Sequence, residues 1–145
     1  MTLHLLKLAV GVESVDHLAS LQKNRLLRER RIHKDASLSH VTRSYPRYHK
    51  KLVSNGSIYW VIKRQILVRQ HLLGFEPTVN RKGGKACRII LDIELFRTVP
   101  RRHRPFQGWR YLADTDAPAD LTKRSTTQED LPLHLVAELR ELGIL

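Results

Sequence analysis

The stretch Ser57–Leu73, SIYWVIKRQILVRQHLL, contains the two clearest strands of this 145-residue chain. Its two halves, Ser57–Lys63 and Ile66–Leu73, are enriched in isoleucine, valine and aromatic residues, which favour strands. The junction at Arg64-Gln65 contains no residue that tight turns favour, so composition alone does not fix where the first strand ends. The stretch predicts a strand pair, and the rest of the fold is built outward from it.

The beginning of the chain predicts a strand followed by a helix. Residues Leu3–Val10 are rich in leucine and valine, which is consistent with a buried strand. Ser14 can cap the helix that follows. An apolar stripe at helical spacing would face the sheet, formed by Val15, Leu18, Ala19 and Leu26. The other sides of this helix carry Lys23, Arg25, Arg28, Arg30 and Arg31.

Further elements follow from the same reasoning. We expect a strand at 40–45, a short helix at 47–53 that ends at Asn55-Gly56, a basic turn at 80–85 and a strand at 88–93. Residues 98–110 are rich in arginine and contain Pro100 and Pro105, so irregular or extended structure is expected there. Asp130 can cap an amphipathic C-terminal helix.

These elements predict an α+β fold with a single domain and a mixed or antiparallel sheet. The predicted domain comprises residues 1–121. Residues 122–145 are expected to form an acidic linker and the C-terminal amphipathic helix. The order of the strands and the basic composition also allow a barrel of the PUA-like group, an expectation that rests on analogy.

Charge is divided unevenly along the chain. Residues 1–110 contain 23 lysines and arginines against seven acidic residues, and the last 35 residues contain three against seven. A surplus of this size weakens the compact state through repulsion, and its commonest counterpart is a polyanion such as nucleic acid. The acidic tail would either pack or lie across the basic face and screen it.

The remaining composition favours a cytoplasmic protein that does not contact membranes. The N-terminus lacks the basic start of a signal peptide, and no run approaches 18 apolar residues. The single cysteine, Cys87, cannot form an internal disulfide. The eight histidines show no ligand spacing and no catalytic signature appears, so we expect no metal, no cofactor and no catalytic residues.

The strand pair provides the first candidate binding residues. Alternation would place Tyr59, Lys63 and Arg69 together on one face, opposite a core face. An aromatic ring among cations suits single-stranded nucleic acid, because rings stack on bases and cations hold phosphates. The alternative is a core position for the ring beside solvated charges.

The arginine-rich loop is the second and stronger candidate. It combines cations with aromatic residues, and its candidate binding residues are Arg101, Arg102, Arg104, Gln107, Trp109 and Arg110. The arginine fork matches phosphate and also stacks on aromatic faces, while a glutamine can read a base edge. The alternative is an ordered loop held to the core by Phe106 and Trp109. Further phosphate attraction is expected from Arg25, Arg28 and Arg43.

Three segments carry a resemblance to a known family. They are the start Met1–Leu8, the Ser57–Leu73 block with YWVIK and VRQ, and the RPFQGWRYL motif at Arg104–Leu112. Together they are similar to short bacterial proteins that share a domain of unknown function, over about the first 121 residues. The resemblance implies a glycine where this chain has Arg64, and it implies no activity, cofactor or partner.

Three functions fit these observations. The first is a non-enzymatic nucleic-acid-binding module with RNA preferred over DNA, because no helix-turn-helix or zinc finger is visible. The second is a small enzyme or binding protein for an anionic small molecule that uses the Arg104–Arg110 loop. The third is an interaction subunit that docks on an acidic protein.

Overall fold

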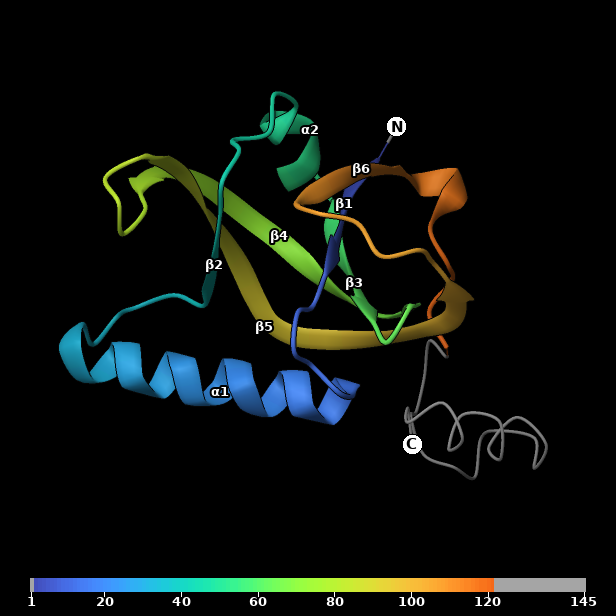
Figure 1. Cartoon of the computed structure of the whole chain (residues 1–145), viewed down its shortest axis with the longest axis horizontal. Helices are drawn as coiled ribbons and strands as arrows, with labels where there is room; N and C mark the ends of the chain where they lie inside the picture. The colour runs from blue at the N-terminus through green and yellow to red at the C-terminus, as the bar shows by residue number, and fades with distance from the viewer. Residues whose placement is uncertain (1, 122–145) are drawn as a thin grey trace.

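The computed structural model describes residues 2–121 (Figure 1). Its elements in chain order are β1 (Leu3–Leu8), α1 (Val15–Ile32), β2 (Ser39–Thr42), α2 (His49–Val53), β3 (Ser57–Ile62), β4 (Gln65–Val79), β5 (Lys85–Arg102), β6 (Trp109–Ala113) and the 3-10 turn η1 (Asp114–Asp116). The predicted C-terminal helix and the rest of the predicted acidic tail, residues 122–145, lie outside the described residues. No helix of the described part is long and apolar enough to cross a membrane.

The six strands form one mixed sheet in the order β2-β5-β4-β3-β1-β6. β1 runs parallel to β3, with Leu6 opposite Tyr59, and all other neighbours are antiparallel. The predicted α+β domain with its opening strand and helix is therefore confirmed. The expected PUA-like barrel is not what forms, because β2 and β6 remain two separate edges and the sheet is open.

The β4–β5 hairpin is much longer than the sequence predicts. Its pairing extends from Gln65 opposite Arg102 to Val79 opposite Lys85, with three shifts of register. Pro100 falls within one of these shifts, between the Ile66–Arg101 and Val68–Arg97 pairs. A strand tolerates proline at such an irregularity, because the missing N–H is not needed there. The expected irregular segment at 98–110 thus begins as strand, and its end forms β6, an element the sequence analysis did not predict.

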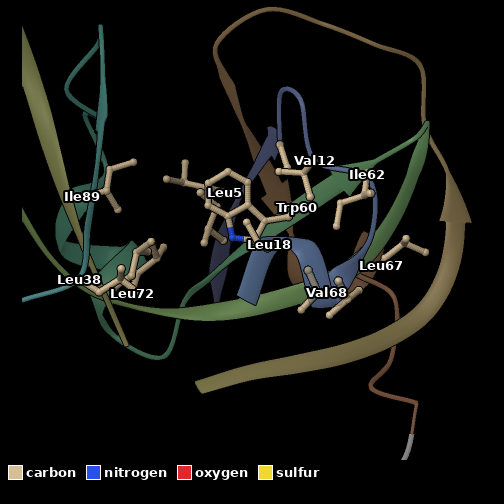
Figure 2. Close-up of a cluster of buried hydrophobic side chains, with 14 of the residues drawn as sticks. Leu5, Val12, Leu18, Leu38, Trp60, Ile62, Leu67, Val68, Leu72 and Ile89 are labelled. Carbon is tan, nitrogen blue, oxygen red and sulfur yellow. The ribbon is translucent and has the colours of Figure 1, made fainter. Parts of the chain in front are cut away.

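Helix α1 lies along one face of the sheet (Figure 1). Ser14 caps it as predicted, with its hydroxyl accepting a hydrogen bond of 3.1 Å from the amide of His17. Val15, Leu18 and Leu26 are buried against the sheet, whereas Ala19 is exposed. Figure 2 shows Leu18 beside Trp60 and Leu5 in this main core.

One polar group sits inside this apolar layer and is fully satisfied. Gln70 is completely buried, and its Oε1 accepts from Trp60 Nε1 at 3.1 Å and from Gln22 Nε2 at 3.0 Å. Its Nε2 donates to the backbone carbonyl of Asp92 at 2.7 Å. A buried amide without hydrogen-bond partners lowers the stability of the fold, so these bonds favour one position of α1 on the sheet.

Both faces of β3 are covered, and this decides what the opposite face can present. Ile58, Trp60 and Ile62 belong to the core beneath α1. Tyr59 and Val61 belong to a second, smaller core, against which Leu8, Phe106, Leu112 and Ala117 pack. The chain that follows β5 therefore covers the face that alternation alone would leave open.

Candidate nucleic-acid interface

Tyr59 lies in the second core. The residue is only 4% exposed, and its ring packs edge-on against the imidazole of His4 with centroids 5.1 Å apart. Burial raises the pKa of the phenol above its ordinary value. No face of this ring is open to a base, so Tyr59 does not belong to a binding surface built from exposed groups.

Arg69 is occupied by an internal partner. Its Nε and one terminal nitrogen donate to the two carboxylate oxygens of Asp120 at 2.7 and 2.8 Å, and the other terminal nitrogen donates to Ser57 Oγ at 3.0 Å. The guanidinium also lies 4.4 Å from the centre of the Phe96 ring. The hydrogen bond to Asp120 raises the pKa of Arg69 above its ordinary value. The pair fastens the end of the described chain to β4, and a backbone bridge between Thr98 and Asp120 joins it to β5.

Asp120→Ala is expected to lower the free energy of unfolding by about 2 kcal/mol, because it leaves a half-buried guanidinium without its charged acceptor. Urea denaturation followed by circular dichroism measures the change. The matched control is Glu13→Ala, which breaks the Lys63–Glu13 pair, whose side chains are 65% and 68% exposed. That variant should leave the midpoint unchanged. Equal midpoints for the two variants would contradict a structural role for Asp120.

Three other predicted binding residues have defined neighbours. Lys63 Nζ contacts the Glu13 carboxylate at 2.8 Å. Arg101 donates to the backbone carbonyl of Asp116. The guanidinium of Arg110 lies 4.9 Å from the centre of the Phe106 ring. Arg101 and Arg110 therefore help to hold the chain around the second core.

Gln107 and Trp109 line a hollow in the described surface. This hollow, which we term the arginine–tyrosine pocket, has a volume of about 800 Å³. It lies between the loop after β2 and the first residues of β6. Its lining residues are Thr42, Arg43, Ser44, Tyr45, Arg47, Gln107, Gly108, Trp109 and Tyr111.

Hydrogen bonds between side chains and backbone join the segment at 44–48 to β6. Trp109 Nε1 donates to the carbonyl of Ser44 at 3.0 Å, and the hydroxyl of Tyr111 accepts from the amide of Tyr48 at 3.2 Å. Gly108 has φ +71°, a conformation that side-chain-bearing residues rarely adopt. The pairing of Trp109 with Lys7 of β1 fixes where β6 begins. The pocket is thus built by tertiary contacts between segments far apart in the sequence.

Exposed rings cluster at the pocket. Tyr45, Tyr48 and Tyr111 are 41%, 48% and 36% exposed. Trp109 packs edge-on against Tyr111 with centroids 4.9 Å apart, and the Tyr48 and Tyr111 rings are 5.4 Å apart. The Tyr45 hydroxyl donates to the carbonyl of Phe75 at 3.0 Å, which holds this ring in place. Rings that are both fixed and exposed provide surfaces on which planar ligands stack.

Arg43 and Arg47 supply the positive charge. Both are exposed, and neither forms an ion pair with a carboxylate of residues 2–121. Lys51 does not line the pocket; its Nζ lies 5.9 Å from the centre of the Tyr48 ring. In this arrangement the guanidinium groups can bind a phosphate and the aromatic rings can stack on a base. The amide of Gln107 can at the same time form hydrogen bonds with the edge of a base.

The sequence predicts only part of this pocket. It selected Gln107 and Trp109, and it named Arg43 among residues that attract phosphate, but Tyr45 and Arg47 were not selected. The available signal was the alternation of cationic and aromatic residues in RSYPRY at 43–48. This signal is weak, because a strand predicted to end before Pro46 gives no reason to place residues 43–48 beside residues 107–111.

The open mixed sheet and the arginine–tyrosine pocket define the architecture of the protein and the type of surface it presents. They do not identify a reaction. A sequence model described as "Protein of unknown function (DUF1489)" matches residues 5–145, and the chain belongs to that family. The predicted resemblance to a family of unknown function is confirmed, and the match continues past residue 121, where the resemblance was expected to end. No curated protein and no solved structure matches the chain.

Proposed function

We propose that this protein binds single-stranded nucleic acid, RNA in preference to DNA, in the arginine–tyrosine pocket and catalyses no reaction. The observation that carries the proposal is that Arg43 and Arg47, which form no ion pair within residues 2–121, line one hollow together with exposed, fixed rings. The net charge of +12 adds a long-range attraction for any polyanion. A cytoplasmic location, where RNA is accessible, belongs to the same proposal.

In the proposed mode of binding, arginine and tyrosine side chains have different roles. Arg43 and Arg47 neutralise phosphates, which gives affinity without sequence preference. Tyr45 and Tyr111 provide stacking surfaces for bases that are not paired. Gln107 lies where its amide can donate to and accept from a base edge. Single strands are favoured over duplexes because only unpaired bases offer a face to these rings.

Replacing both pocket arginines, Arg43→Gln with Arg47→Gln, is expected to weaken binding to a single-stranded RNA at least tenfold at low salt. If the wild type neutralises about five phosphates, log K falls with log salt at a slope of roughly −3.5, and losing two contacts makes that slope shallower by about 1.4. Fluorescence anisotropy with labelled RNA, DNA and an unrelated polyanion, repeated over a salt series, measures both quantities.

The matched control is Arg81→Gln with Lys82→Gln, which removes the same charge from the tip of the β4–β5 hairpin. The amides of Lys82 and Gly84 already donate to Asn80 Oδ1 at 2.9 and 2.8 Å, so they are not available to cradle a phosphate. This control should bind RNA almost as the wild type does. An equal loss in the two double variants, or equal affinity for RNA and the unrelated polyanion, would reject the pocket as the binding site.

The volume of the pocket supports a second candidate, a binding site for an anionic small molecule. About 800 Å³ lies within the usual range of small-molecule pockets, roughly 300–1,000 Å³. A nucleoside phosphate would use the same arginines and rings as a strand. A mononucleotide that binds as tightly as a ten-nucleotide RNA would favour this candidate over the first.

A further inference from the structure

The turn between β3 and β4 has an unfavourable backbone. Lys63 and Arg64 are its two central residues, and their φ angles are +49° and +67°. Two consecutive left-handed residues are typical of the type I′ hairpin turn, which strongly favours glycine and asparagine. Lysine and arginine adopt this conformation only at a cost in stability. The geometry of the turn therefore does not explain why lysine and arginine occupy these two positions.

Arg64 lies beside the arginine-rich end of β5. The amide of His103 donates to the Arg64 carbonyl at 2.9 Å, and Gln65 is paired with Arg102. A small hollow of about 280 Å³ lies here, lined mostly by apolar atoms of Arg64, Arg102, His103, Arg104 and Pro105. We term it the turn hollow. It gathers residues 64 and 102–105, which the sequence separates by almost forty positions.

The three arginines of the turn hollow have no internal counter-charge within residues 2–121. None of them forms an ion pair with a carboxylate there, whereas Arg69 and Arg97 pair with Asp120 and Asp16. Lys63, the other residue of the turn, pairs with Glu13. Like charges brought together without a partner raise the energy of the folded state, and a bound anion relieves that repulsion.

We propose that the guanidinium groups of Arg64, Arg102 and Arg104, around the turn hollow, form a subsite for a backbone phosphate of the same strand that enters the arginine–tyrosine pocket. This inference rests on the proposed function. The two sites share one loop, since Pro105 lines the turn hollow and Gln107 lines the pocket. Two residues of chain span at most about 7 Å between their Cα atoms, which a strand of a few nucleotides bridges.

Arg64→Gly separates a binding role from a structural one, because its two expected effects have opposite signs. Glycine accepts the left-handed conformation, so the midpoint of thermal unfolding should rise. The affinity for a ten-nucleotide single-stranded RNA should fall about fivefold, with the salt slope shallower by about 0.7. The affinity for a dinucleotide, which reaches the pocket alone, should stay the same.

Lys63→Gly is the matched control, since it makes the same change of charge in the same turn. It should also raise the unfolding midpoint, and it should leave RNA affinity nearly unchanged because Lys63 is held by Glu13. Unchanged binding of the ten-nucleotide RNA to Arg64→Gly, or an equal loss in the two variants, would overturn the subsite.

Inorganic pyrophosphate tests the subsite independently of RNA. In an NMR titration of the full chain, it should shift the amide resonances of residues 102–104 in the wild type and shift them much less in Arg64→Gly. If RNA fails to bind but these shifts appear, the proposed function fails while the anion site stands. If RNA binds in the pocket and pyrophosphate moves none of these resonances, the subsite fails while the proposed function stands.

Discussion

Gly56→Ala is expected to prevent the protein from folding stably. Gly56 lies between α2 and β3, and an added Cβ would lie 2.1 Å from the carbonyl oxygen of Leu52 and 2.5 Å from that of Leu3. Both atoms belong to backbone that cannot rotate away, and the Gly56 carbonyl also accepts from the amide of Leu72 at 3.0 Å. We expect a loss of about 4 kcal/mol or more, beyond ordinary overpacking.

Gly74→Ala provides the comparison for this substitution. Gly74 lies within β4, and an added Cβ would meet only the side chain of Ile90, at 3.9 Å or more. Its stability should stay within about 1 kcal/mol of the wild type, because the added methyl group makes only ordinary van der Waals contact and Gly74 does not have a left-handed φ. Soluble yield and urea denaturation compare the two variants. Equal midpoints would show that the backbone of Leu3, Leu52 and Gly56 is not closely packed.

Acid is expected to destabilise the protein through His40. Burial lowers the pKa of His40 from 6.5 to about 4, and the positive charges of Lys7 and Arg25 act in the same direction. The ring packs edge-on against Trp60 with centroids 5.3 Å apart, and its Nε2 has no hydrogen-bond partner among the described residues. The folded protein therefore keeps this imidazole neutral at a pH where the unfolded chain protonates it.

The direction of the pH effect follows from this difference. Below about pH 6.5 the unfolded chain binds a proton that the folded chain excludes, so stability falls as the pH is lowered and levels off near pH 4. The contribution of His40 over this window is at most roughly 3 kcal/mol.

Urea denaturation of the wild type and of His40→Gln at pH 7 and pH 4.5 measures the contribution of this residue. The variant should lose less stability between the two pH values than the wild type does. The control His33→Gln, at an exposed histidine, should follow the wild type. A pH dependence that is the same in His40→Gln and in the wild type would assign the acid effect to other groups.

Local signals predicted most of the elements correctly. Ser14 caps α1, α2 ends before the left-handed Asn55, and Ser57–Ile62 forms a strand, as their residue types indicate. β6 was missed because WRYLA is short and follows a proline-containing, arginine-rich run. Its strand conformation comes from pairing with β1, a partner more than a hundred residues away.

The faces of β3 show a different kind of limit. The run IYWVI is continuously apolar, a pattern typical of a strand covered on both sides. Alternation nevertheless predicts one open face with Tyr59 and Arg69. Whether that face is open depends on the chain after β5, which covers it through Phe106, Leu112 and Asp120. The apolar run within β3 indicates cover on both faces, but it does not indicate which segment provides that cover.

By itself, the sequence determined the α+β composition, the capped helix with a basic outer side and the excess of positive charge, because these depend on residue type and short-range spacing. Only the tertiary structure decided which charges remain unpaired. Asp120 neutralises Arg69 and Asp16 pairs with Arg97, whereas Arg43 and Arg47 meet rings from β6, and Arg64 meets the end of β5. An ion pair or a pocket depends on distances between segments far apart in the chain, and those distances are set by how the sheet is paired.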